Sequence, residues 1–430
     1  MHFQAIIVYI IFIVKLYFNI DDWNRRSSMT EKETTNKQST LFTIILGALT
    51  AIGALSIDMF LPGLPQIQSD FNTTTTHAQM AVSMFLIGLA LGNLFVGPIS
   101  DALGRKKPLI FAMGLFTLAS IGICFTNSIE FMLALRFVQG LCGGAGAVIS
   151  RAIASDLYSG KQLTQFLALL MLVNGIAPII APTIGGGIIT YANWRMVFIV
   201  LTVFGILMLV GSTIKVNETL TSEHREPPQI LIIFRNFLTL LRSAHFVLPM
   251  LIQGVTFVML FSYISASPFI TQRVYSLTAQ QFSYMFAGIG ITLIISSQLT
   301  GKLVNYIERQ YLLRTLTAIQ IIGVVCVVTT LTAHLPIVVL IAGFILLVAP
   351  VTGVSTLAFS IAMDESTVGN GSASSLLGLI QSLLGGVASS LVGLMGEQNI
   401  IPYVVIIIVA GICLIVLQTL NYIVFRKSNI

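Results

Sequence analysis

Long apolar runs alternate with short polar segments between residues 41 and 425. There are twelve such runs of about 20 residues each, and a helix of that length crosses about 30 Å of hydrocarbon. The pattern therefore predicts an all-α membrane protein with twelve transmembrane helices. The runs lie near residues 42–66, 78–99, 109–127, 130–155, 163–190 and 195–214, and then near 245–268, 281–301, 312–331, 335–358, 371–394 and 401–425.

The longest hydrophilic segment, residues 215–244, separates the first six runs from the last six. A weak repeat also relates the two sets, because Gly301, Asn305 and Arg309 follow Gly97, Asp101 and Arg105 at an interval of about 204 residues. Repeats of this kind indicate two halves built on one plan. We expect an N-terminal six-helix bundle at 41–214, a cytoplasmic linker at 215–244, a C-terminal six-helix bundle at 245–425 and a cytoplasmic tail at 426–430.

Residues 1–40 precede the first of the twelve runs. Residues 5–20 are apolar apart from Lys15, but no basic segment precedes them and no small-residue cleavage pattern follows them, so a signal peptide is disfavoured. The next stretch is polar and contains Met29, where a protein of this kind could begin. We interpret residues 1–28 as an upstream extension, and an additional membrane helix is the alternative.

Composition and charge agree with a bilayer as the solvent. The chain is 56% hydrophobic and 9% charged, with a mean hydropathy of +0.93. The net charge of +6 is interpreted as the cation bias of cytoplasmic loops, not as a sign of nucleic-acid binding. Both ends of the twelve-span core should then face the cytoplasm, in a bacterial inner membrane. The loops on that side carry Arg105, Lys106, Lys107, Arg151, Lys161, Lys215, Arg225, Arg235, Arg242, Lys302, Arg309 and Arg314, whereas the opposite loops carry Arg195 and Arg273.

A short polar segment, Gly97 to Pro108, lies between the second and third runs. Its two glycines permit tight turns, and three successive cations follow an aspartate by four residues. We expect its side chains to reach the inner end of the fourth run, near Arg151 and Asp156, and to form a latch that releases when the two halves rock. A plain topological anchor is the alternative. The predicted latch residues are Gly97, Asp101, Gly104, Arg105, Lys106 and Asp156.

Two ionisable residues, Asp58 and Arg136, lie well inside apolar runs. Charges at such depth normally face a cavity, a partner or a transport pathway. The helical rise places them roughly 15 Å and 9 Å from the outer ends of their runs, so a direct or water-bridged pair is plausible. The pair could be a static structural bridge. Alternatively, Asp58 could be a carboxylate that exchanges a proton during transport.

Further residues complete the set of candidates. Pro178, Pro182, Gly185 and Gly186 predict a kinked and closely packed fifth helix, where the kink serves either gating or fit. Polar groups in a mostly apolar wall could line a central cavity for lipophilic ligands, although packing explains each of them equally well. These cavity candidates are Asp58, Gln139, Gln253, Tyr263, Tyr284 and Gln381.

Several of these segments resemble motifs of the major facilitator superfamily. Residues 97–107 resemble its loop motif, G-x-x-x-D-x-x-G-R-[RK]-[RK], and Arg136 with Gln139 and Gly140 resembles the R-x-x-Q-G pattern of the fourth span. Residues 181–186 are similar to the proline/glycine motif of drug:proton antiporters, with Ala181 in place of the usual glycine. Residues 58–65 resemble the first-span signature of the bicyclomycin-resistance (Bcr/CflA) branch.

The resemblance implies two six-helix bundles around a central cavity and proton-coupled efflux of small lipophilic or cationic drugs by alternating access. Asp58 and Arg136 would then serve proton coupling. A proton-coupled importer of a small nutrient on the same fold is the alternative. An enzyme is disfavoured, since the five histidines are scattered and no nucleotide-binding loop is present. We expect a monomer with no cofactor and no metal site.

Overall fold

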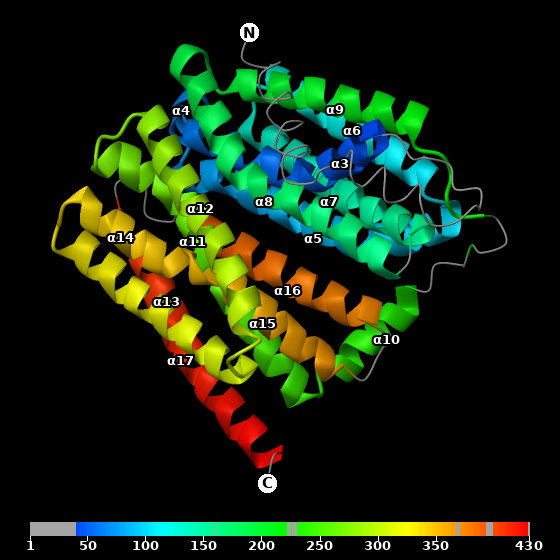
Figure 1. Cartoon of the computed structure of the whole chain (residues 1–430). Helices are drawn as coiled ribbons and strands as arrows, with labels where there is room; N and C mark the ends of the chain where they lie inside the picture. The colour runs from blue at the N-terminus through cyan, green and yellow to red at the C-terminus, as the bar shows by residue number, and fades with distance from the viewer. Residues whose placement is uncertain are drawn as a thin grey trace. The chain divides into compact units, whose positions relative to one another are not determined.

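The computed structural model describes residues 40–158, 160–221, 225, 230–366, 370–392 and 399–428. Contacts divide the chain into two units, residues 1–40 and residues 41–430, and the helices described below belong to the second (Figure 1). The predicted extension at 1–28 lies outside the described residues. The predicted tail at 426–430 begins inside the last helix, which continues to Ser428.

The described residues form helices and turns without strands, so the all-α prediction is confirmed. In this part of the chain eleven helical segments are long and apolar enough to cross a membrane. The segment α8 is a further long helix of 32 residues. The first half comprises α3 (Thr40–Asp58), η1 (Leu61–Gly63), α4 (Leu64–Asp70), α5 (Thr75–Leu103), α6 (Lys106–Phe125), α7 (Ile129–Leu157), α8 (Gly160–Tyr191) and α9 (Arg195–Lys215).

The second half follows a short linker helix, α10 (Ile230–Leu240). Two spans of the second half are composite: α11 continues into a π-helical turn, and the fourth span is interrupted at Ala349, directly before Pro350, which divides it into α14 and α15. A proline lacks the N–H that would continue the helical ladder, which explains this break. The elements are α11 (Ala244–Phe269), η3 (Ile270–Val274), α12 (Ala279–Leu303), α13 (Arg309–Thr332), α14 (Ile337–Val348), α15 (Pro350–Asp364), α16 (Asn370–Leu391) and α17 (Ile401–Ser428).

The two glycines of the segment 97–108 lie in different conformations. Helix α5 continues through Pro98 to Leu103, and the chain turns only at Gly104, whose φ is +88°. A Cβ added to Gly97 would lie 3.7 Å from Val148, an ordinary contact. Of the two glycines that could permit a tight turn, only Gly104 therefore makes one. Proline inside a membrane helix is tolerated because neighbouring groups satisfy the freed backbone.

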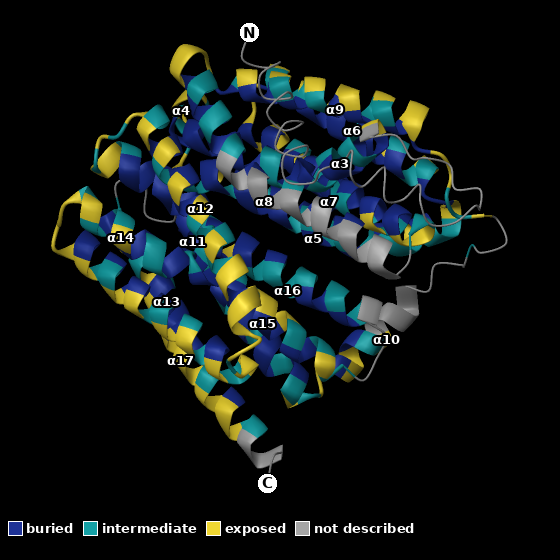
Figure 2. Ribbon diagram, viewed as in Figure 1, coloured by how far each residue is buried: buried dark blue, intermediate teal, exposed yellow. Residues whose placement is uncertain are grey.

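Helices α5 and α7 pack backbone to backbone. Gly88 and Gly92 on α5 face Gly140 and Gly144 on α7, and a Cβ on any of these four would overlap backbone atoms of the other helix. The four-residue spacing on both helices places the small residues on one face of each, which allows this close approach. Buried positions accordingly line the contact between the two helices (Figure 2).

The two halves join each other near one end of the bundle. We call this the Asp70 end, after Asp70 of the first half, which accepts hydrogen bonds within that half from Trp194 Nε1 at 2.8 Å and from Arg195 Nη1 at 3.2 Å. The opposite end, where α5 turns into α6, is the Arg105 end. A single buried apolar cluster contains residues of both halves, among them Phe60, Leu64, Phe269 and Phe282.

Hydrogen bonds reinforce this junction. Gln272 Nε2 donates to the Pro62 carbonyl at 3.3 Å, and Gln79 Nε2 donates to the Ser265 carbonyl at 3.1 Å. Ser390 donates to Ser83 at 2.7 Å. Two further apolar clusters lie toward the Arg105 end, one within the first half and one formed by the second half and α10 with Leu94. The halves are thus bonded to each other toward the Asp70 end.

Candidate functional site

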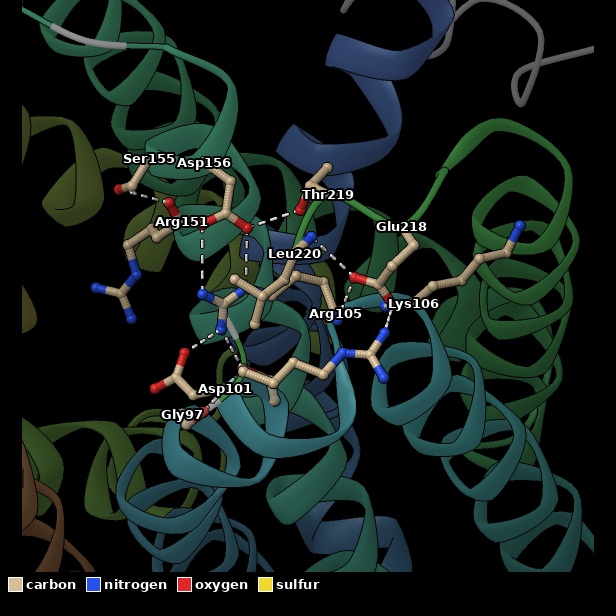
Figure 3. A network of polar contacts seen from close by, with 12 residues as sticks. Gly97, Asp101, Arg105, Lys106, Arg151, Ser155, Asp156, Glu218, Thr219 and Leu220 are labelled. Atoms are coloured by element: carbon tan, nitrogen blue, oxygen red, sulfur yellow. Dashed lines mark hydrogen bonds and ion pairs between the residues drawn. The ribbon is translucent and has the colours of Figure 1, made fainter. Parts of the chain in front are cut away.

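At the Arg105 end, Arg105 connects α5 with α7 (Figure 3). Its guanidinium donates to Asp156 from Nε at 3.0 Å and from Nη2 at 3.3 Å, and Nη1 donates to Asp101 and, at 2.7 Å, to the Ser100 hydroxyl. Only 9% of the Arg105 side chain is exposed. The contact predicted between this segment and Asp156 is therefore present. Arg151 takes no part in it, because its Nε donates to the carbonyl of Ala147 one turn earlier.

The chain that follows α9 completes this cluster. Glu218 accepts hydrogen bonds from the backbone N–H of Arg105 at 2.8 Å and of Lys106 at 3.3 Å, and Thr219 donates to Asp156 at 2.7 Å. Glu218 thus satisfies free N–H groups at the start of α6, where the helix dipole also favours an anion. Lys106 contributes its backbone N–H. Sequence reasoning missed Glu218 and Thr219, although an acid directly after the sixth apolar run was a usable signal.

Ionisation in this cluster follows from its hydrogen bonds. Burial raises the pKa of Glu218, but the backbone N–H groups of Arg105, Leu220 and Lys106 and the nearby Arg225 outweigh it, so the pKa lies below its ordinary value. Burial opposes the charge of Arg105, yet its bonds to Asp156 and Asp101 bring the pKa above the ordinary value. Both groups are therefore charged at neutral pH. We call Asp101, Arg105, Asp156 and Glu218 the Arg105 clamp.

Gly104 is required at the turn for two reasons. Its φ of +88° is unfavourable for residues with a side chain, and a Cβ there would overlap the carboxylate of Glu218. The members of the clamp all belong to the first half and the start of the linker, and the clamp is closed while the halves are joined at the Asp70 end. It therefore bonds parts of the first half to one another and does not itself bridge the two halves.

The second half carries a smaller counterpart. Arg309 Nη1 contacts Asp364 and donates to Ser360 at 3.0 Å. The sequence repeat relates Arg309 to Arg105, but Asp364 stood in a loop without a cation nearby in sequence. Here 45% of the Arg309 side chain and 55% of the Asp364 side chain are exposed, so this pair is more open to solvent than the Arg105 clamp.

Arg136 is fully buried inside the first half. Its Nη1 donates to the Ser56 carbonyl at 3.1 Å and to Gln139 Oε1 at 3.0 Å, and its guanidinium lies 4.2 Å from the centre of the Phe60 ring. Gln139 in turn donates to Ser120 at 2.7 Å. With no exposed surface and its amide bonded within the half, Gln139 does not line a cavity here. The structure corrects that expectation.

Asp58 does not pair with Arg136. The two form no ion pair, and within the described residues Asp58 makes no hydrogen bond, although it is only 5% exposed. The reason lies in helix geometry. Arg136 contacts the side of the first span formed by Ser56 and Phe60, and Asp58 is two residues from each, or about 200° around an α-helix. The direct Asp58–Arg136 pair is therefore absent.

The local chain holds Asp58 at an interruption of the first span. Helix α3 ends at Asp58, and the next helical turn, η1, contains Pro62. On α8, Gly185 packs so closely that a Cβ would overlap the Met59 carbonyl, and a Cβ on Gly186 would overlap the Ser283 hydroxyl of the second half. These two glycines therefore hold α8 against both halves at the level of Asp58. Helix α8 is continuous across Pro182, which is buried, and the side chain of Pro178 lies outside the described residues.

In the second half, Tyr263 of α11 belongs to the same buried apolar cluster as Phe60 of the first span. Its ring stacks on Phe286 with centroids 5.5 Å apart, and Phe344 lies edge-on at 4.9 Å. Only 1% of Tyr263 is exposed. Asp58 and Tyr263 thus belong to the junction between the halves.

Gln253 and Gln381 meet deeper in the second half. Gln253 Nε2 donates to Gln381 Oε1 at 2.7 Å and to Ser355 at 3.3 Å, joining α11, α15 and α16. Tyr284 is not part of this group. It is 62% exposed and shares one face of α12 with Ile291, Ile295 and Leu299, which are also exposed and sit at helical spacing. The expected place of Tyr284 in a cavity stays a prediction.

The described hollow lies elsewhere. It has a volume of about 610 Å³ and lies between α6 and α9. None of the predicted site residues lines it, and the central cavity remains a prediction. Within the described residues no three His, Cys, Asp or Glu side chains gather as a metal site requires. The hollow between α6 and α9 is lined by Ile121, Cys124, Phe125, Ala192, Asn193, Arg195, Met196, Ile199 and Thr202.

Comparison with known proteins adds independent information. The family profile described as Major Facilitator Superfamily matches residues 46–393. The chain is 34% identical to "Uncharacterized MFS-type transporter YdgK" of Bacillus subtilis, over 88% of this chain and 94% of that protein. It is 29% identical to "Bicyclomycin resistance protein homolog" of Haemophilus influenzae, over 92% and 98%. It is 25% identical to "Multidrug resistance protein MdtM" of Escherichia coli K12, over 63% and 65%.

Solved structures show the same fold at low identity. A crystal structure of a bacterial homolog to the human lysosomal transporter Spinster has a TM-score of 0.72 at 12% identity, covering 91% of this chain and 98% of that chain. A crystal structure of D-xylose-proton symporter has a TM-score of 0.68 at 16% identity, covering 87% and 97%.

Proposed function

The chain belongs to the Major Facilitator Superfamily, and from that premise we propose that it is a proton-driven exporter of small lipophilic or cationic drugs. Two relatives support this class of substrate by their names, a bicyclomycin resistance protein homolog that matches 92% of this chain and a multidrug resistance protein that matches 63% of it. Transport would proceed by alternating access, in which the two halves open the substrate site first to one side of the membrane and then to the other.

The observation that carries the proposal is the state of Asp58. A carboxylate at this depth in a membrane-spanning helix, with no cation and no hydrogen-bond donor bonded to it among the described residues, is costly to keep charged. Asp58 also lies at the junction of the halves, where the first span is interrupted. A group whose surroundings change when the halves move, and which can be neutralised by one proton, is suited to couple protons to that movement.

The orientation of the cycle follows from the loops. The Lys and Arg excess assigns the Arg105 end to the cytoplasm, so the Asp70 end faces outward and the described state has its halves joined on the outside. In this state Asp58 would still carry the proton taken up from outside. A drug entering from the cytoplasm would bind as Asp58 releases that proton inward. In the outward-facing state, protonation of Asp58 would weaken its hold on the drug.

The Arg105 clamp takes a narrower role than a latch between the halves. We propose that it fixes the ends of α5 and α7 and the start of the linker as one unit. Movement of the linker would then be transmitted to the first half. Arg136 keeps the first half rigid around Asp58 through Ser56, Ala81 and Gln139.

The test is drug transport by purified protein in liposomes with an imposed pH step. Wild type should concentrate a lipophilic cation against its gradient, Asp58→Asn should bind some substrates without concentrating them, and Asp58→Glu should keep part of the coupling. Uphill transport by Asp58→Asn that collapses with a protonophore would show that another group carries the proton. Proton-dependent accumulation of a nutrient, with no drug transport, would support the importer instead.

A further inference from the structure

The hollow of about 610 Å³ between α6 and α9 lies near the Asp70 end of the first half. Its wall is mostly apolar, and four of the side chains that line it are exposed: Ile121 and Phe125 of α6, and Met196 and Ile199 of α9. In a chain that spans a membrane, exposed apolar side chains on the spans face the lipid tails, which are equally apolar. The hollow is therefore open to the hydrocarbon of the bilayer.

Arg195, the first residue of α9, is the one charged residue in this lining. Its guanidinium donates to Asp70 at 3.2 Å and to the Thr126 carbonyl at 3.3 Å, and it lies 4.4 Å from the centre of the Trp194 ring. Within the described residues these two acceptors use two of its five N–H groups, so three are left. The guanidinium is thus fixed in position and still has donors to offer.

The hollow has the depth of a lipid site. It extends along α9 from Arg195 to Thr202, and seven residues of helix rise about 10 Å. One leaflet contributes about half of the roughly 30 Å of hydrocarbon in a bilayer. Because Arg195 begins its span, the cation lies at the level of the lipid head groups, and the apolar wall lies beside the first part of the acyl chains.

From this arrangement we propose that the hollow binds a phospholipid from the leaflet at the Asp70 end. Its phosphate would contact the Arg195 guanidinium, since arginine makes charge-assisted hydrogen bonds to phosphate and basic positions between membrane helices recognise lipid head groups. One acyl chain would lie against Ile121, Phe125 and Ile199. The bound lipid would connect the end of α6 with the start of α9. None of the residues proposed for transport takes part, so the inference does not rest on the proposed function.

Other occupants match only part of the hollow. A free phosphate ion would have the charge that Arg195 requires, but it would gain nothing from the apolar wall. A lipophilic cation would fit the wall, but Arg195 would repel it. A phospholipid satisfies both features at once.

Cys124 provides a probe inside the hollow. It is a free, half-buried thiol in the lining, whereas Cys413 on α17 is a free, exposed thiol of the second half. The test measures the rates at which N-ethylmaleimide alkylates these two cysteines in the purified full-length protein in detergent micelles, resolved by peptide mass spectrometry. A general lipid shell slows both reactions, so the ratio of the two rates reports on the hollow.

Phosphatidylglycerol should lower the rate at Cys124 relative to Cys413 about tenfold when the site is nine-tenths occupied. Dioleoylglycerol, which has acyl chains and no phosphate, and inorganic phosphate, which has no chains, should each have little effect. Equal slowing of both cysteines would indicate a general lipid shell only and would overturn the proposal. Selective protection of Cys124 by dioleoylglycerol, by inorganic phosphate or by a lipophilic cation, to the same extent as by phosphatidylglycerol, would overturn it as well.

Two variants and a control test the assigned contacts. Arg195→Gln should reduce the protection by phosphatidylglycerol to that given by dioleoylglycerol. Arg273→Gln is the matched control, because Arg273 is the other cation of the loops on this side and does not line the hollow, and it should keep the tenfold effect. Ile199→Trp keeps Arg195 and fills the hollow, so it should abolish the lipid dependence. If Arg195→Gln does not fold, a lipid dependence that persists in Ile199→Trp overturns the proposal.

Photocrosslinking gives a second measurement that does not depend on the reactivity of Cys124. A phosphatidylglycerol with a diazirine in its acyl chain should crosslink preferentially to residues 121–125 and 196–199. Crosslinks spread evenly over the exposed faces of the spans would contradict the proposal. Faster alkylation of Cys124 in a chain that begins at Met29 would show that residues 1–28, and not a lipid, cover the hollow.

Discussion

Removal of one charge from the Arg105 clamp gives a quantitative test of the two carboxylates that bind the Arg105 guanidinium, Asp156 and Asp101. Asp156 accepts two hydrogen bonds from a guanidinium that is 9% exposed, and its own side chain is 16% exposed. Asp101 contacts the same guanidinium, but half of its side chain faces solvent. Asp156→Asn should therefore lower the free energy of unfolding by about 2 to 3 kcal/mol. Asp101→Asn should lower it by about 0.5 kcal/mol, the range of exposed pairs.

The difference of about 2 kcal/mol corresponds to a factor of about 30 in the ratio of folded to unfolded protein. It is measured by denaturant titration of the purified protein in mixed micelles, with helix content followed by circular dichroism. Asp364→Asn in the exposed Arg309 pair is the control and should resemble Asp101→Asn. Equal losses for Asp156→Asn and Asp101→Asn would refute the argument, since burial would then not determine the strength of the clamp.

Three further predictions follow from the same structure. The Glu218 pKa is depressed, so its contribution to stability is present above its ordinary pKa and is lost as the pH falls through the lowered value. Glu218→Gln should thus flatten the acid side of the stability profile, measured by thermal unfolding. Asp101→Asn should lose drug transport while membrane insertion persists, and unchanged transport would leave the segment a topological anchor. Cysteines introduced at 215–244 should resist labelling by a membrane-impermeant reagent from outside, and external labelling would overturn the proposed orientation.

The sequence was sufficient for the spans because hydrophobic length is a local property. The twelve predicted runs and the observed helices agree along the described chain, and most ends differ by only a few residues. The contact between Arg105 and Asp156 was also predictable, because the loop charges predict that both lie at the same end of neighbouring spans. Membrane topology thus identifies which ends meet.

Side-chain direction was harder to obtain. Depth suggested that Asp58 and Arg136 could pair, yet depth does not say which way a residue faces around its helix. The two-residue spacing from Ser56 to Asp58 decides the matter, but only once the face of the first span toward Arg136 is known. Tyr263 has a similar history. It was one of several aromatic and polar candidates in the second half, and only packing against Phe286 and Phe344 separates it from the exposed Tyr284.

The glycine contact between α5 and α7 has a mechanical consequence. Helices that pack through interdigitated side chains can shift along each other by one turn and repack. Helices α5 and α7 instead contact backbone to backbone at Gly88 and Gly140. Helices α5 and α7 therefore have no second packing register, and they must move together as one rigid body. The contact of this pair that can change is the one between α5 and α16. There the Ser390 hydroxyl donates to Ser83 at 2.7 Å, and this hydrogen bond can break without opening a cavity. One face of α5 is thus fixed to α7 and the other makes a contact with α16 that can be broken and re-formed. The same helix would both move with the first half and form the axis about which the two halves rotate.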